Sequence, residues 1–353
     1  MDSDGFVLLY APEMKAAIYT GNGRMEVLEK PVPKPSSGEV LLAVGRVGIC
    51  GSDLLIFQGG MSHRAGPGRI LGHEMVAVVA ETTVGGIVQA GDRVVVEPTV
   101  SCGHCRACRR GLTHVCQHLR FLGIDADGAL QQFWAVPANR LHKVPDAILD
   151  DCAAMVEPLA VAVHDVHLGA VRAGETVAIS GGGPIGLLIA LLAKRAGGKV
   201  VVLEINLHRL AFARQLGLDA WNPQERSSVK FLGEFTDGAG ADVVFEASGS
   251  ATGARLLTSL AAIRGRLIIV GIQGKKVPVD LFQVFYRELS VQGTRAYSSE
   301  DFKEAIRLIS DEEINLSEFI SHRYPLRDIQ AAMELARSGT PVMKILIDLG
   351  SAG

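Results

Sequence analysis

Four of the chain's six cysteines lie within one short stretch, in the spacing C-x2-C-x2-C-x7-C. They are Cys102, Cys105, Cys108 and Cys116. Four thiolates so close in sequence can surround one Zn2+ as a complete tetrahedral shell. Because a complete shell leaves no position for water or substrate, this spacing predicts a structural zinc site that holds a loop in place.

A second set of potential metal ligands is spread along the chain: Cys50, His73, Glu74 and Glu157. A thiolate and an imidazole together suit Zn2+. Catalytic zinc usually has three protein ligands and one open position, which Cys50, His73 and one carboxylate would supply. Either glutamate can be the third ligand. Taken singly, each of these residues is more typical of a core or surface position, so the prediction depends on their combination.

A glycine-rich turn, GGGPIG at residues 181–186, follows a predicted strand and opens a predicted helix. Its first glycine permits a tight turn, its third lets the backbone approach a pyrophosphate, and its last lets the helix pack on the sheet. The helix N-terminus then faces the phosphates. The predicted dinucleotide contacts in this turn are Gly181, Gly183, Pro184, Ile185 and Gly186.

An acidic residue ends the next predicted strand. Glu204 stands about twenty residues beyond the turn, where a carboxylate can accept hydrogen bonds from both ribose hydroxyls of NAD and would repel a 2′-phosphate. The sequence therefore predicts NAD(H) in preference to NADP(H). Arg209 is a further predicted cofactor contact, and its positive charge is the main argument for NADP.

The bulk composition excludes several classes of protein. The chain has 353 residues, 48% of them apolar, and a net charge of −3. This length predicts about two domains, and the charge argues against a nucleic-acid binder. We expect no membrane span and no signal peptide, because no long uncharged apolar run occurs and the N-terminus is acidic. Clustered cysteines in a chain this long indicate metal ligands in the reducing cytoplasm. Residues 1–12 have no role that we can derive.

Two patterns of secondary structure divide the chain. The first half predicts short, largely antiparallel strands at 15–19, 39–47, 75–81 and 93–96. From about residue 157, strands at 176–180, 200–204, 242–247 and 266–270 alternate with helices at 185–196, 208–216 and 254–263. This alternation is typical of a parallel sheet with helices on its faces. Helices at 301–309 and 328–338 and a strand at 342–349 complete the chain.

Together these motifs resemble the zinc-dependent medium-chain dehydrogenases of the alcohol and polyol dehydrogenase superfamily. The resemblance rests on five motifs in the family's order, covering nearly the whole chain: GICGSD (48–53), GHE (72–74), the four-cysteine lobe (102–116), EPLAVAVH (157–164) and GGGPIG (181–186). It implies an α/β fold with a GroES-like β catalytic domain, residues 1–157 completed by 301–353, and a Rossmann doubly wound domain, residues 158–300.

The resemblance also implies roles for individual residues. Cys50, His73 and Glu157 would lie beside a catalytic zinc, with Glu74 as a neighbour that can exchange into the shell. Many alcohol dehydrogenases have a cysteine where this chain has Glu157, and the glutamate is similar to the sorbitol-type branch. Asp53 would accept a hydrogen bond from His73 and so orient the ring.

The family's reaction is hydride transfer between a secondary alcohol and C4 of the nicotinamide, with zinc as a Lewis acid on the substrate hydroxyl. Ser52 is placed to accept the alcohol proton. The outer histidine that often continues this proton path is replaced by Leu55. The resemblance thus implies an NAD-dependent zinc enzyme acting on a polyol, cyclitol or sugar derivative.

Two polar residues of sorbitol dehydrogenases are missing here: their arginine falls on Ala296 and their tyrosine on Ile56. This argues against sorbitol itself, although Arg295 could point inward instead. The expected pocket walls are Ser52, Ile56, Phe57, Phe121, Glu157 and Arg295.

Two other functions stay open. One is a dehydrogenase of threonine-type 3-hydroxy amino acids or amino alcohols, and the other is a non-catalytic zinc- and nucleotide-binding protein. For all of these functions the expected partner is a small molecule. For a dehydrogenase it is an alcohol or a ketone. Relatives join their Rossmann sheets edge to edge through the region of residues 266–294, so we expect a homodimer or homotetramer.

Overall fold

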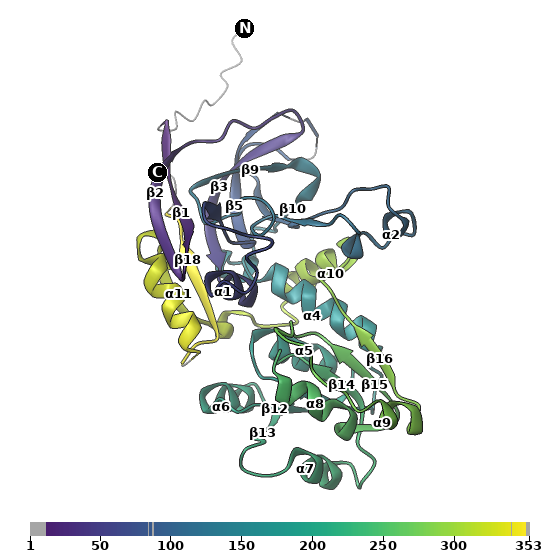
Figure 1. Ribbon diagram of the computed structural model, residues 1–353. Helices are drawn as coiled ribbons and strands as arrows, with labels where there is room; N and C mark the ends of the chain where they lie inside the picture. Colours follow the sequence, from purple (N-terminus) through teal and green to yellow (C-terminus); the bar gives the residue numbers. More distant parts are fainter. Residues whose placement is uncertain (1–11, 84, 87, 340, 351–353) are drawn as a thin grey trace.

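The computed structural model describes residues 12–83, 85–86, 88–339 and 341–350. The acidic segment 1–12 therefore lies, apart from its last residue, outside the described part. Figure 1 shows two parts, one built on largely antiparallel sheets that contain both the first and the last strands, the other on a parallel sheet, with helices between them. None of the described helices is both long and apolar enough to cross a membrane.

Within the described residues, the N-terminal part and the last strands of the chain together form three sheets. The largest has the order β10-β6-β5-β3-β18-β17, and β9 also pairs with β3. Its strands are β3 (Glu39–Gly48), β5 (Glu74–Thr82), β6 (Arg93–Val96), β9 (Phe133–Pro137), β10 (Leu141–Lys143), β17 (Ile320–Pro325) and β18 (Lys344–Asp348). The smaller sheets consist of β1 (Glu13–Gly21), β2 (Arg24–Pro31) and β4 (Arg69–Ile70), and of β7 (Thr99–Val100) and β8 (Arg120–Phe121).

The C-terminal strand β18 completes the largest sheet. It pairs antiparallel with β3, so that Leu346 lies opposite Gly48. The two strands are almost 300 residues apart in the sequence, and their pairing brings the end of the chain next to the GICGSD segment. Helix α1 (Gly51–Phe57) begins directly after β3, and α11 (Ile329–Ser338) packs beside it.

The second part is a six-stranded sheet in which every pairing is parallel. Its strand order is β13-β12-β11-β14-β15-β16, the Rossmann order 3-2-1-4-5-6. The strands are β11 (Thr176–Ser180), β12 (Lys199–Leu203), β13 (Asp219–Trp221), β14 (Ala241–Glu246), β15 (Ala261–Ile269) and β16 (Ser290–Gly293). Its helices are α5 (Pro184–Arg195), α6 (Leu207–Gln215), α7 (Ser228–Phe235), α8 (Ala251–Leu260) and α9 (Leu281–Tyr286).

Two helices between the sheets join the parts. Helices α4 (Val156–Gly169) and α10 (Ser299–Ser310) pack on each other, and one continuous apolar core runs from Val76 and Val95 of the first part to Ile179 of the second. Asp301 at the start of α10 accepts hydrogen bonds from His164 and His167 of α4, at 2.8 and 2.7 Å. The remaining short helices are α2 (Arg106–Arg109), α3 (Asp150–Ala153) and 3-10 turns at Thr113–Val115, Ala138–Arg140, Ser317–Phe319 and Leu326–Asp328.

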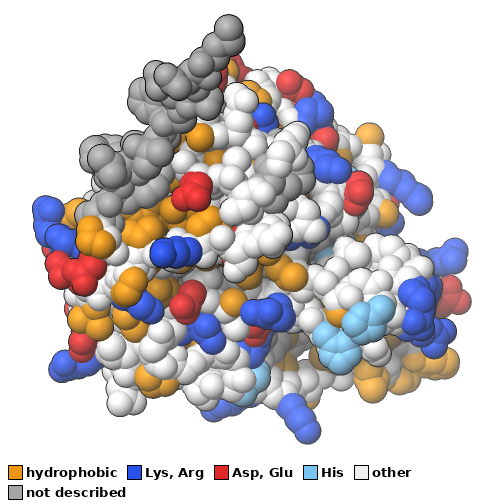
Figure 2. Space-filling model, turned by 90° about the horizontal axis from the view of Figure 1, so that it is seen from above, with side chains coloured by type: hydrophobic (Ala, Val, Ile, Leu, Met, Phe, Trp, Pro, Cys, Tyr) orange, Lys and Arg blue, Asp and Glu red, His pale blue; other side chains and the backbone are white. Residues whose placement is uncertain are grey.

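The predicted fold class is confirmed, but several predicted element bounds differ from the observed ones, most clearly where α8 gives way to β15. Residues 261–263, predicted as the end of a helix, begin β15, where Ala261 pairs with Ala241 of β14. Alanine favours a helix here, but the pairing and burial of Ala261 in the sheet override that local preference. On the face seen in Figure 2, acidic and basic side chains are interspersed. A group of histidines also lies there, near basic side chains.

Candidate active site

Cys50 lies at the junction between strand β3 and helix α1. It is the N-cap residue of α1, and its backbone N–H donates a 2.9 Å hydrogen bond to the Asp53 side chain. This bond closes the first turn of the helix, so a short-range interaction fixes where the thiol is presented. Ser52, two residues after Cys50, has a buried hydroxyl that makes no hydrogen bond to any described residue.

His73 and Glu74 follow a glycine that no other residue can replace easily. Gly72 has φ of +93°, and a Cβ there would lie 2.9 Å from the side chains of Leu130 and Val47. The tight turn delivers His73 and Glu74, which are 2% and 1% exposed, to the start of β5. Ligand atoms of Cys50, His73 and Glu74 all lie within 4.8 Å of one another. The donors are a sulfur, a nitrogen and an oxygen, a set that fits Zn2+.

A buried lysine faces this cluster. Lys344, the first residue of β18, is 4% exposed and donates to both carboxylate oxygens of Glu74, at 2.6 and 2.8 Å. Its third hydrogen bond reaches the Ile49 carbonyl at 3.2 Å. Burial alone lowers the pKa of Lys344, but the charges of Glu74 and Cys50 outweigh it and raise that pKa above its ordinary value. The pocket is therefore rich in negative charge, which favours a cation.

Glu157 reaches the same region from the first turn of α4. It is 5% exposed, and its Oε1 accepts a 2.8 Å hydrogen bond from the hydroxyl of the fully buried Tyr297. Burial and the nearby Glu74 carboxylate together raise the pKa of Glu157 to about 7, against the opposing effects of His73, Tyr297 and Lys344. The carboxyl group therefore lies close to the cluster, although its oxygens are not within the 4.8 Å group formed by the other three residues.

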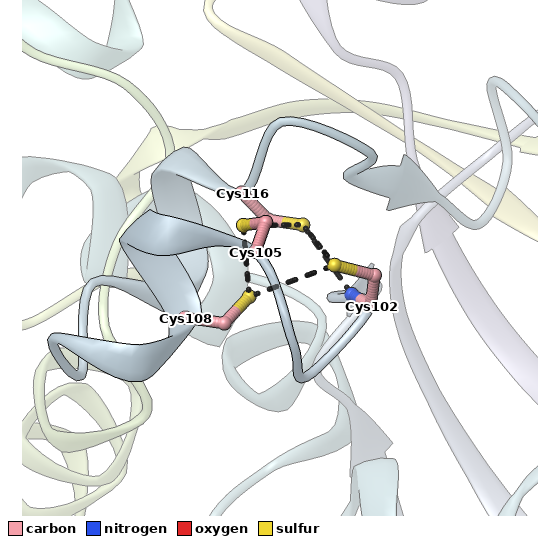
Figure 3. A group of neighbouring side chains, drawn as sticks. All are labelled: Cys102, Cys105, Cys108 and Cys116. Carbon is pink, nitrogen blue, oxygen red and sulfur yellow. Dashed lines mark hydrogen bonds between the residues drawn. The ribbon is translucent and has the colours of Figure 1, made fainter.

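The four-cysteine lobe brings its sulfur atoms together around one point (Figure 3). Neighbouring Sγ atoms are 3.5 to 4.0 Å apart. Four sulfurs at about 2.3 Å from one Zn2+ would be about 3.8 Å from each other. The lobe therefore has the size of a tetrahedral zinc shell without rearrangement, and Cys105 and Cys116 are buried within it.

The glycine-rich turn is shaped for close backbone approach. Gly181 has φ of +107°, and a Cβ on Gly186 would lie 1.9 Å from the Gly181 carbonyl oxygen. Gly183 is the N-cap of α5, and Pro184 occupies its first turn. A cavity of about 240 Å³ lies between this turn and the cluster of Cys50, His73 and Glu74. Its lining includes Cys50, Glu74, Gly183, Pro184, Ile185, Gly186, Arg209 and Lys344.

Glu204 and Arg209 lie next to the turn. Each carboxylate oxygen of Glu204 accepts a backbone N–H at 2.7 Å, from Gly182 and from Asn206. Each oxygen keeps a second lone pair that a ribose hydroxyl can use. The Arg209 side chain lines the cavity, and its buried Nε has no partner among the described residues.

Several expected contacts differ in detail. Asp53 Oδ1 lies 3.8 Å from His73 Nδ1, too far for the expected hydrogen bond. Of the expected pocket walls, Ile56 and Phe57 are buried in the core, and Arg295 is exposed. Phe121 instead packs edge-on against the His73 ring, 5.1 Å between centroids.

Sequence reasoning missed two residues of the cluster, Lys344 and Tyr297. The signal for Lys344 was a lysine opening the apolar strand segment KILIDL, where a buried charge needs a partner. The signal for Tyr297 was the likeness of residues 293–297 to the Gly-x-x-Arg-Tyr segment of sorbitol dehydrogenases, but that likeness did not indicate a contact with Glu157.

Comparison with known proteins agrees with this geometry. Residues 36–146 match the model of the alcohol dehydrogenase GroES-like domain, and residues 184–311 match that of the zinc-binding dehydrogenases. The expected fold, a GroES-like β part with a Rossmann sheet, is thereby confirmed. Together the two matches cover more than half of the chain.

Three curated relatives span almost the whole chain. The 2-dehydro-3-deoxy-L-galactonate 5-dehydrogenase of Pseudoalteromonas atlantica is 43% identical, over 95% of this chain and 98% of that protein. The L-threonine 3-dehydrogenase of Pyrococcus abyssi is 37% identical, over 89% and 92%. The sorbitol dehydrogenase of Halalkalibacterium halodurans is 33% identical, over 94% and 99%.

Two similar solved structures hold different cofactors. A protein of Sinorhizobium meliloti described as a zinc-binding dehydrogenase and bound to NADP is 30% identical, with a TM-score of 0.88 over 95% of this chain and 99% of that one. An alcohol dehydrogenase of Escherichia coli in complex with NADH is 28% identical, with a TM-score of 0.88 over 96% and 100%. These matches show a zinc- and nicotinamide-dependent oxidoreductase, and the chain belongs to the zinc-type medium-chain alcohol dehydrogenase family.

Proposed function

We propose that this enzyme transfers a hydride between NAD and the secondary alcohol of a polyol or sugar derivative. One observation carries the proposal: a single cavity is lined both by Cys50 and Glu74 and by the glycine-rich turn at 183–186. A metal-held alcohol and a nicotinamide would meet there. The galactonate and sorbitol dehydrogenases among the relatives support a polyhydroxylated substrate.

Cys50, His73 and a carboxylate would hold the catalytic zinc. When bound, the metal supplies a Lewis acid that lowers the pKa of the substrate hydroxyl. Glu74 is within ligand distance but shares both oxygens with Lys344, whereas Glu157 uses only Oε1, for Tyr297. We therefore propose that Glu157 binds the metal directly or through water, and that Glu74 is a close neighbour that can exchange into the shell.

Ser52 would accept the proton of the substrate hydroxyl. Its own hydroxyl is buried and has no partner within the described chain, so its capacity to accept and to donate a hydrogen bond is unused there. With Leu55 at the position of the usual outer histidine, the proton would leave through the cofactor ribose or through water beside Glu157.

We propose NAD as the preferred cofactor because Glu204 stands where a 2′-phosphate would meet a buried carboxylate. The division of the chain into residues 1–157 with 301–353, and residues 158–300, is part of the same proposal. The boundary falls in the first turn of α4, so this helix serves both parts.

We propose a cytoplasmic location because all six cysteines are free of disulfide bonds. Cell fractionation would test it.

The test of function is steady-state reduction of NAD and NADP with a panel of polyols, cyclitols, sugar acids and threonine. We expect turnover with at least one polyhydroxylated secondary alcohol, a higher kcat/KM with NAD, and loss of turnover in Cys50→Ser. Threonine as the best substrate would favour the amino-acid alternative. A fully zinc-loaded protein that is silent on the whole panel would contradict the proposal and favour the non-catalytic one.

The two proposed zinc sites should be separable by substitution. We expect two zinc ions per chain in the wild type and one in each of Cys50→Ser and Cys105→Ser. Cys50→Ser should stay folded without turnover, because it removes only a catalytic ligand. Cys105→Ser should lower the unfolding temperature, because the lobe loses its cross-link. Metal analysis and thermal unfolding measure both effects; a fully stable Cys105→Ser that loses only turnover would exclude a structural role for the lobe.

We also propose that β16 pairs with the β16 strand of a second copy, giving a dimer or a tetramer built from dimers. This strand is a sheet edge, with Val291 53% exposed, and beside it helix α9 exposes Phe285 at 78%. An apolar open edge of this kind tends to be covered by another chain. Sedimentation should give a dimer or tetramer at micromolar concentration, and Val291→Lys should weaken it. A wild-type monomer would refute the proposal.

A further inference from the structure

The ring of His73 is held by packing rather than by a hydrogen bond to Nδ1. This nitrogen is buried and has no partner within the described chain, since Asp53 Oδ1 is 3.8 Å away. The ring instead packs perpendicular to the ring of Phe121, at an interplanar angle of 89°. A residue that fixes the position of the Phe121 ring therefore also influences the orientation of the His73 ring.

Phe121 is positioned in turn by Asp125. The Asp125 carboxylate accepts the Phe121 backbone N–H at 2.8 Å, and the Asp125 backbone N–H donates to the Phe121 carbonyl at 2.8 Å. These bonds close a tight loop. The same loop presses on the backbone before His73, because a Cβ on Gly123 would lie 2.4 Å from the Gly72 carbonyl oxygen.

Asp125 also ties this loop to the segment that follows helix α1. Arg64 donates two parallel hydrogen bonds to the Asp125 carboxylate, at 2.9 and 2.6 Å. A bidentate pair of this kind fixes geometry as well as distance. Arg64 keeps the pKa of the Asp125 carboxyl below its ordinary value against the opposing effect of burial, so the carboxylate stays charged at neutral pH.

We propose that Asp125 is a positioning residue for the catalytic centre, holding Phe121 against His73 through a clamp anchored on Arg64. The inference rests on the proposed function, because it concerns the metal site on which that function depends. Supports of this kind around a metal ligand change metal affinity or activity by about 10- to 100-fold.

The same loop supplies a matched control. Asp127 accepts a backbone N–H from Ile70 at 3.2 Å and a hydrogen bond from Arg69 at 3.2 Å, so it also joins one arginine and one main-chain group. It makes no hydrogen bond to Phe121 in the described structure. Asp125→Ala and Asp127→Ala therefore remove similar interactions, but only the first releases Phe121.

The experiment is cadmium NMR of the cadmium-substituted enzyme, combined with zinc affinity by chelator competition. The resonances of the four-thiolate site and the Cys50–His73 site should be separate, because they differ in sulfur ligands. We expect Asp125→Ala to shift or broaden only the Cys50–His73 resonance and to weaken zinc binding there by about 10-fold or more. Asp127→Ala should change neither, and Asp125→Ala should add little in a Phe121→Ala background.

An unmoved resonance with wild-type zinc affinity in Asp125→Ala would overturn the inference, as would equal effects of Asp127→Ala or additive effects of Asp125→Ala and Phe121→Ala. A wild-type enzyme that shows only the four-thiolate resonance would instead overturn the proposed catalytic metal centre, and the inference with it. Neither readout needs the substrate to be known.

Discussion

The buried ion pair between Lys344 and Glu74 is the interaction on which the site depends. Two charges at 4% and 1% exposure are costly to bury unless each satisfies the other, and Lys344 meets both oxygens of Glu74. The pair can form only if β18 lies beside β3 in its observed register. The end of the chain is therefore an integral part of the site, although most of the other cluster residues come from the first half of the sequence.

The pair also shapes the electrostatics of the cavity. Cys50, Asp53, Glu74 and Glu157 are four acidic groups in one largely buried region, and Lys344 is the lysine that faces them. The negative groups raise the pKa of His73 well above its ordinary value even though burial alone lowers it. A divalent cation satisfies the same potential without a proton, which explains why this cluster suits a metal.

Local spacing was enough to predict the fold class and the four-cysteine lobe, whereas the grouping of Cys50 with His73 and a carboxylate was predicted only through their combination and the family resemblance. The cysteines of the lobe are close in the chain, and the turn at 181–186 lies between a strand and a helix that its own pattern predicts. Lys344, Tyr297 and the orientation of Phe121 depend on contacts between segments more than 45 residues apart, which no local pattern encodes. The helix predicted over 254–263 was wrong at its end for the same reason, since the pairing of Ala261 with Ala241 is tertiary.

Denaturant unfolding of the metal-free protein tests the role of the ion pair most directly. The variants to compare with the wild type are Lys344→Met and the double variant Lys344→Met with Glu74→Gln. If the pair holds β18 against the site, the single variant leaves a buried carboxylate unpaired and loses about 3–5 kcal/mol of unfolding free energy. The double variant should recover most of that loss. A Lys344→Met protein as stable as the wild type would contradict the account.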